Sequence, residues 1–312
     1  MIRDVRRADT PRLISLMERE FPEESALLGN RPEGFEEVAR RVFRWDRRLI
    51  LGLLRVLGRP IFRYLVIEVD GELVATTLLT FPRVSAYVSN VVVDPAHRRR
   101  GYAKRLLEEA RQSAKRADRE YIALDVLDTN TAARTLYESI GYQPLRAKSH
   151  MVLDLTGPIA TSRVANPAIR PFRRTDPRAL AALVRRQTPA AVESVLPTGE
   201  RAFAPSGFMN RILASEEATW VIDRGAGPEG HVAASVSAAT TAAHMTAPVL
   251  AETLDVALGE DLVRTAAAWC AARQAPRILS LIADDNTGGR AALEAVGFRH
   301  ALSSHTLYRP VD

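Results

Sequence analysis

Short apolar runs, each followed by a turn signal or an amphipathic segment, alternate along the first half of the chain. Tyr64–Val69 and Leu73–Thr80 read as strands, and the pair Asp70-Gly71 between them is typical of a tight β-hairpin turn. A third apolar run, Ser85–Val93, ends at Asp94-Pro95 and predicts a long strand. The chain therefore opens with an antiparallel meander.

The next segments alternate between helical and extended periodicity. Gly101–Ala117 places its apolar residues on one helical face, and Thr131–Ile140 does the same over a shorter length. Tyr121–Leu127, between them, and Leu145–Leu155, after them, predict strands. The pattern predicts an α+β fold, with a mixed, mostly antiparallel sheet flanked by helices.

A repeat divides the chain into two similar halves. The segments Asp128–Tyr142 and Asp284–Phe298 match at an offset of about 156 residues, and each follows an apolar run. Both halves also begin with Ile-Arg followed by a helical pattern. The sequence therefore predicts two tandem domains, at residues 1–156 and 168–312, with 157–167 as a linker rich in small and turn residues.

Composition narrows the class of protein without defining its chemistry. The chain has 312 residues, enough for two domains of ordinary size, and 43 Lys and Arg against 37 Asp and Glu. This basic excess is compatible with nucleic acid, a membrane surface or a phosphorylated cofactor as partner, and it is too mild to choose among them. No nucleic-acid reading motif is present. A single cysteine, Cys270, excludes an intrachain disulfide and a cysteine-based zinc site, and the six histidines show no ligand spacing, so we expect no metal. The first residues lack the apolar core of a signal peptide, and we expect a cytoplasmic protein without a membrane span.

The segment that points to chemistry joins the third strand to the first long helix. After Pro95 the chain carries three arginines, Arg98–Arg100, and then Gly101 at the predicted helix start. Free backbone N–H groups at a helix N-terminus form an anion site. Residues with small or no side chains, here Gly101 and Ala103, let a phosphate approach the backbone. The arrangement is neither a Rossmann glycine motif nor a P-loop.

These residues resemble the GNAT superfamily of acetyltransferases. Arg98-x-x-Gly101-x-Ala103 is similar to the family's pyrophosphate loop, Gln/Arg-x-x-Gly-x-Gly/Ala. Asn130, Ala133, Leu136-Tyr137 and Gly141-Tyr142 are similar to a second signature of that family. The resemblance covers residues 1–156 well and the second half weakly.

The resemblance implies acetyl-coenzyme A as cosubstrate and transfer of its acetyl group to an amine by direct attack. The residues implied in cosubstrate binding are Val91, Val93, Arg98, Arg99, Arg100, Gly101, Tyr102, Ala103, Lys104 and Asn130. Val93 would also polarise the thioester carbonyl through its N–H, and Tyr137 would protonate the departing thiolate as general acid. The first half holds no cysteine, so an acyl-cysteine route through that site is excluded.

The chain departs from the family pattern where many relatives carry a basic carboxylate. The strand before the loop reads Tyr87-Val88-Ser89-Asn90, without an acid. The alternatives are a water held by Ser89 or Asn90, the carboxylate of Asp125, or the acidic run Glu18, Glu20, Glu23 and Glu24. The missing acid also keeps open a non-catalytic acyl-CoA-binding sensor or scaffold.

The second half keeps the second signature and loses the first. An offset of about 158 residues aligns Gly259 with Gly101, which places Val256 at the arginine position and Glu260 and Asp261 beside the glycine. Carboxylates repel a phosphate, and Leu293 replaces Tyr137, so we expect a degenerate domain that binds no coenzyme A productively.

Structural roles compete with several of these assignments. Tyr137 could pack in the core, Asn130 could cap its helix, and Cys270 is expected to be a buried thiol. Arg40–Pro60, which mixes arginines with large apolar residues, fits a helix covering the core or a membrane-surface or peptide-binding segment. The acceptor could be a small-molecule amine or a peptide amine. Transfer of a longer acyl group, or transfer to an oxygen acceptor, stays open. A homodimer is possible.

Overall fold

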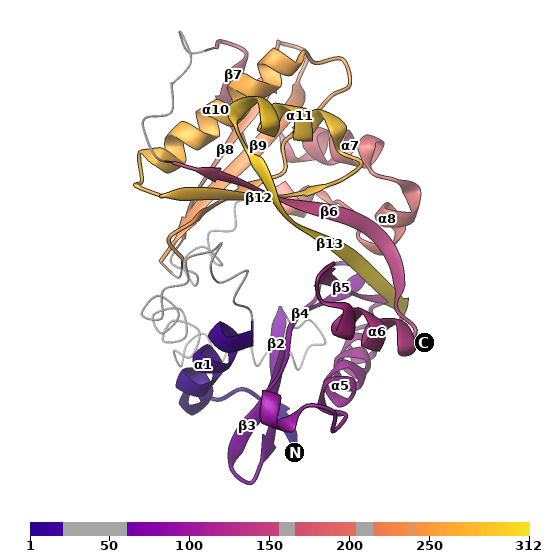
Figure 1. Ribbon diagram of the computed structural model, residues 1–312. Coiled ribbons are helices and arrows are strands. Elements are labelled where there is room, and N and C mark those ends of the chain that lie inside the picture. The colour runs from indigo at the N-terminus through magenta and orange to yellow at the C-terminus, as the bar shows by residue number, and fades with distance from the viewer. Residues whose placement is uncertain (21–60, 156–165, 204–214, 239) are drawn as a thin grey trace.

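Thirteen strands form one continuous sheet in the computed structural model, which describes residues 1–20, 61–155, 166–203, 215–238 and 240–312 (Figure 1). The strand order is β1-β2-β3-β4-β5-β13-β6-β12-β10-β9-β8-β7, and β11 pairs with β9 outside this path. The predicted α+β class, with two similar lobes and a mixed, mostly antiparallel sheet flanked by helices, is confirmed.

The first half of the chain supplies six strands and three described α-helices. The strands are β1 (Ile2–Asp4), β2 (Phe62–Val69), β3 (Glu72–Thr80), β4 (Ser85–Val93), β5 (Tyr121–Leu127) and β6 (Gln143–Asp154). The helices are α1 (Thr10–Glu20), α5 (Tyr102–Arg116) and α6 (Thr131–Ser139). Each predicted strand and helix of this half is present within two or three residues of its expected ends. At the hairpin turn Asp70 and Gly71 both have positive φ, at 49° and 81°, which explains the Asp-Gly pair.

The second half supplies the other seven strands and four described α-helices. The strands are β7 (Ile169–Pro171), β8 (Ser215–Asp223), β9 (Pro228–Ser237), β10 (Ala243–Thr246), β11 (Val249–Leu250), β12 (Arg277–Ala283) and β13 (Arg299–Pro310). The helices are α7 (Pro177–Gln187), α8 (Ala190–Val195), α10 (Val256–Ala271) and α11 (Thr287–Val296). The helix following β12 repeats the position of α6 after β5, as the internal repeat predicts.

The two halves exchange their last strands. β13 lies between β5 and β6 and is antiparallel to both, while β6 pairs on its other side with β12 (Figure 1). Leu307 of β13 therefore belongs to the apolar core of the first half, and Met151 of β6 belongs to the core of the second. The sequence predicted these strands but not their partners. The predicted boundaries at residues 156 and 168 stay a prediction, because most of the intervening residues lie outside the described chain.

Helices cover both faces of the first lobe. On one face α5 and α6 bury Leu107, Leu124 and Val126, and on the other α1 packs Leu16 against Val66. Cys270 is fully buried within α10, and burial raises the pKa of its thiol to about 12, as expected for a structural cysteine. Arg40–Pro60 lies outside the described residues.

Candidate active site

Strands β4 and β5 separate halfway along their length. They pair in parallel from Ser85 and Tyr121 to Val88 and Leu124, and the pairing stops there. Just beyond, β4 carries one extra residue relative to β3, and Asn90 has a positive φ of 55°. This β-bulge bends β4 away from β5 and leaves an opening between two strand ends.

Backbone groups of Val91 and Val93 face this opening. The Asp94 N–H donates to the Val74 carbonyl of β3, so it points away from β5. Because successive N–H groups of a strand alternate in direction, the N–H groups of Val93 and Val91 point toward the opening. An extended ligand placed there can bond to β4 as an additional strand.

The helix after β4 begins with a loop whose amides are free of helical partners. Asp94 caps a single 3₁₀ turn, Pro95–His97, by accepting from the Ala96 N–H at 3.0 Å. Gly101 then adopts a φ of 79°, and the first intrahelical bond of α5 runs from the Arg105 N–H to the Gly101 carbonyl. The N–H groups of Tyr102, Ala103 and Lys104 therefore project from the helix end, where the helix dipole favours an anion.

The three arginines of the loop are exposed to solvent. Arg98 donates from Nε to the Val93 carbonyl at 3.3 Å, which holds it at the mouth of the opening. Arg99 has a left-handed backbone with φ 63°. The structure thus brings the predicted loop and the predicted strand residues to one place.

Asn130 acts as the cap of α6. Its side chain accepts from the Ala133 N–H at 3.1 Å, which accounts for its structural role. The residue is exposed beyond the end of β5, so the predicted ligand contact is compatible with capping and stays a prediction.

Tyr137 lies on the buried face of α6, in the same apolar cluster as Val91. Its ring is 6% exposed and lies 5.8 Å from that of Tyr142, centroid to centroid. Burial raises the pKa of Tyr137 to about 12, so the phenol stays protonated at neutral pH. A protonated phenol can donate a proton, although packing alone also explains the burial.

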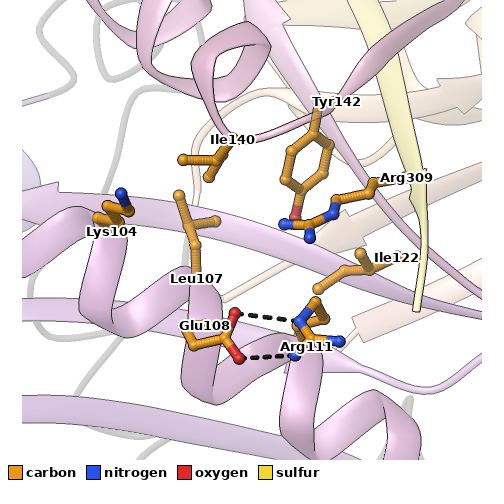
Figure 2. Close-up of a pocket in the computed structure, with 8 residues that line it drawn as sticks. All are labelled: Lys104, Leu107, Glu108, Arg111, Ile122, Ile140, Tyr142 and Arg309. Atoms are coloured by element: carbon orange, nitrogen blue, oxygen red, sulfur yellow. Dashed lines mark hydrogen bonds and ion pairs between the residues drawn. The ribbon is translucent and has the colours of Figure 1, made fainter. Parts of the chain in front are cut away.

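A cavity of about 300 Å³ opens between α5 and the end of α6 (Figure 2). Its lining residues are Lys104, Leu107, Glu108, Arg111, Ile122, Ile140, Tyr142 and Arg309. Sequence reasoning missed most of this set. The spacing of Lys104, Glu108 and Arg111 on one helical face was a usable signal, but Arg309 reaches the cavity only through the strand exchange.

A polar cluster occupies the opposite face of the sheet, beside the point where β4 and β5 separate. The Asp125 carboxylate accepts from Lys148 Nζ at 2.9 and 3.0 Å and from Thr306 Oγ1 at 2.6 Å. Tyr87 lies next to it, and burial together with the Asp125 charge raises the pKa of that phenol. Strands of both halves meet in this cluster.

The predicted alternatives for the general base fall in different situations. Asp125 is already paired, and Ser89 and Asn90 lie at the bulge, where the Ser89 carbonyl accepts from Thr77 Oγ1 at 3.0 Å. Burial raises the pKa of Tyr64, which interacts with Asn90, to about 12. Glu23 and Glu24 lie outside the described residues, as do the side chains of Glu18 and Glu20.

No comparable loop precedes α10, the described helix in the position of α5, and the predicted alignment of Gly259 with Gly101 is wrong. The residue before α10 is Asp255, whose carboxylate accepts from the Ala257 N–H at 3.0 Å. Gly259 lies one turn inside α10, where a Cβ would come within 2.6 Å of Leu250 Cδ1. Its role is close packing, and the carboxylate at the helix start is Asp255 rather than Glu260 or Asp261.

The opening between strands is also closed in the second half. The Asn286 Nδ2 donates to the Pro248 carbonyl at 2.9 Å, beside the end of β10. Gly289, the counterpart of Ala133, has so little space that a Cβ would lie 2.3 Å from the same carbonyl. The first turn of α11 therefore occupies the place that stays open beside β4.

The described residues contain no group of three or more His, Cys, Asp or Glu side chains arranged to hold a metal ion. No helix among them is long and apolar enough to cross a membrane.

Residues 13–142 match the family model of the acetyltransferase (GNAT) family. A Bacillus subtilis (strain 168) protein, provisionally assigned as a ribosomal protein bS18-alanine N-acetyltransferase, is 30% identical over 89 residues. That match covers 28% of this chain, and the chain spans 59% of the length of this relative.

Solved structures extend the likeness to the whole chain. A tandem GNAT protein from the clavulanic acid biosynthesis pathway superposes with a TM-score of 0.68 at 19% identity, covering 100% of this chain and 98% of its own. A GCN5-related N-acetyltransferase from Sphaerobacter thermophilus gives 0.66 at 17%, covering 100% and 95%. At these identities the likeness concerns the fold, which is that of tandem GNAT proteins.

Proposed function

We propose that the first half transfers an acetyl group from acetyl-coenzyme A to an amine. The observation that supports this most is the conjunction of an open strand pair with an anion-binding helix start. The amides of α5 and the arginines before it suit a pyrophosphate, and the N–H groups of Val91 and Val93 suit the amide-containing arm that follows. No other described part of the chain combines these features.

The proposed chemistry needs only groups that lie near the opening. The N–H of Val93 would donate to the thioester oxygen as negative charge develops there, and Tyr137 would give its proton to the leaving thiolate. The amine approaches from the opposite face of the sheet, where Tyr87 and Asp125 lie. Because Asp125 is held by Lys148, we favour a water at Ser89 or Asn90 as the proton acceptor.

The proposed acceptor rests on the similarity to a known relative and not on the geometry of the site. The Bacillus subtilis relative is provisionally assigned as a ribosomal protein bS18-alanine N-acetyltransferase, so we include a peptide with an N-terminal alanine in the panel beside small amines. We propose the second half as a structural partner without a coenzyme site, because Asp255 and Asn286 fill the positions that a coenzyme would need.

Release of free thiol from acetyl-coenzyme A, measured with a panel of amines and peptides, tests the proposal. Tyr137→Phe is expected to keep coenzyme binding and lower kcat by about a hundredfold, since a general acid contributes on that scale. Binding without turnover on any acceptor would favour the alternative function, a non-catalytic acyl-CoA sensor or scaffold.

Coenzyme binding has its own test. The double variant Arg98→Glu, Gly101→Asp places two carboxylates at the helix start and is expected to abolish binding, as measured by calorimetry. The matched control Arg99→Gln keeps the helix start intact and is expected to weaken binding only slightly. Unchanged affinity in the double variant would refute the site.

A further inference from the structure

The cavity between α5 and α6 is apolar at its floor and basic at its rim. Leu107, Ile122 and Ile140 form the apolar part, and Tyr142 closes it with a phenol whose pKa is raised by burial. Its volume of about 300 Å³ lies at the lower end of the range for small-ligand sites, about 300 to 1,000 Å³. The cavity is large enough for part of a ligand.

The charges at the rim leave a net positive site. Glu108 and Arg111 neutralise each other through two hydrogen bonds of 2.8 and 3.0 Å, drawn as dashed lines in Figure 2. Lys104 and Arg309 have no ion-pair partner among the described residues. Two uncompensated cations beside an apolar floor favour a ligand that carries both a ring and an anion.

Arg309 is held in position by the backbone it crosses. Its side chain passes over Gly141, where a Cβ would lie 3.5 Å from Nε, and its guanidinium lies beside the hydroxyl end of Tyr142 (Figure 2). Hydrogen bonds from Arg111 and Gln112 lower the pKa of Glu108, and the charge of Arg309 adds a smaller contribution in the same direction. The Arg309 guanidinium therefore faces the cavity and not solvent alone.

The cavity reaches the first turn of α5. Lys104 is the third residue of that helix and also lines the cavity, which extends along the helix to Arg111. Seven residues of helix span about 10 Å. A ligand with a diphosphate at the helix start and a second anion near Arg309 would be bound at both ends. Its ring would then pack on the apolar floor of the cavity.

We propose that this cavity takes the 3′-phosphorylated nucleoside end of the cosubstrate, and that Arg309 binds its monoester phosphate. The inference rests on the proposed function, because it assigns the far end of the same ligand. Arg309 belongs to β13, so the second half supplies a binding residue to the first through the exchanged strand. The second half then has a role in the site although it has no coenzyme site of its own.

Calorimetric affinities for coenzyme A and 3′-dephospho-coenzyme A test this assignment. The unaltered protein is expected to bind coenzyme A at least about tenfold more tightly, which is typical of a charge-assisted contact to phosphate. Arg309→Gln should reduce that ratio to about two while leaving the affinity for 3′-dephospho-coenzyme A unchanged. Arg309→Lys keeps the positive charge but lacks the planar pair of guanidinium donors. It should restore part of the affinity ratio between coenzyme A and 3′-dephospho-coenzyme A.

Arg299→Gln is the matched control, because Arg299 lies on the same strand but is paired with Asp154 at 2.8 Å. It should keep the full ratio. An equal loss of both affinities in Arg309→Gln, or equal affinities in the unaltered protein, would overturn the assignment while leaving acetyl transfer intact. Absence of binding by either nucleotide would refute the proposed function together with this inference.

Discussion

Glycines of this chain are required by backbone conformation at some positions and by packing at others. Gly101 has open space around it and a φ of 79°, so glycine is required there by the backbone of the loop before α5. Gly259 has a normal backbone and lacks space for a Cβ, so its glycine is required by packing. On sequence alone, Gly259 aligns with Gly101.

His231 gives a prediction at the residue scale. It is 6% exposed, neither ring nitrogen has a hydrogen-bond partner among the described residues, and burial lowers its pKa to about 4. The unfolded chain takes up this proton near pH 6.5, so folding is penalised progressively as the pH falls from about 6.5 to 4. The free energy of unfolding should drop by up to about 3 kcal/mol over that window, as measured by denaturant titration.

The matched variant is His231→Phe, which keeps a ring next to Phe203, whose centroid lies 5.0 Å away. It should remove most of this pH dependence. His150 and His244 are shifted in the same direction by burial and should account for what remains. A variant that keeps the full dependence would show that His231 is not the group responsible.

At the scale of elements, the difference between the two lobes lies in how a helix meets a strand end. In the first lobe α6 starts clear of β4, because the bulge at Asn90 moves β4 aside. In the second lobe α11 starts against the Pro248 carbonyl, and Asn286 bonds to it. One lobe is open to a ligand between its strands, and the other is sealed.

Two adjacent glycines of α11 allow a test of this seal. Gly289→Ala should lower the free energy of unfolding by about 2 kcal/mol, because its Cβ would overlap the Pro248 carbonyl. A Cβ added at Gly288 would meet no atom within 4 Å, so Gly288→Ala should be neutral or slightly stabilising, since alanine favours a helix. Equal effects of the two substitutions, measured by thermal unfolding, would argue against a sealed helix start.

At the scale of the whole molecule, the exchanged strands join two domains into one folding unit. Leu307 is fully buried in the core of the first lobe although it belongs to the second half of the sequence. Neither half can complete its sheet alone. We therefore expect a single cooperative unfolding transition for the chain, observed alike by calorimetry and circular dichroism.

Reciprocal core substitutions extend this expectation. Leu307→Ala and Met151→Ala should each destabilise the whole chain by about 3 kcal/mol, because each leaves a cavity in the lobe opposite to its own half. Both should shift one transition rather than split it. Two separate transitions in either variant would show that the lobes fold independently.

The fold could be predicted far along the chain because its local signals agree. Hydrophobic periodicity defined the strands, Asp70-Gly71 defined a turn, and the repeat defined two similar lobes. The position of the loop before α5 could be predicted because its signals are local, with charge, glycine and helix start contiguous in sequence. Anion binding by this loop stays a prediction.

The sequence by itself determined the elements, the tandem plan and the loop that suits a pyrophosphate. Only the tertiary structure decided the partners of β6 and β13, the sealing of the second lobe and the presence of Arg309 beside α5. Strand pairing has this dependence because periodicity specifies which face of a strand is apolar, but not which neighbour completes its hydrogen bonds. Two similar lobes offer two similar edges, and the choice between them is made by packing across the whole sheet.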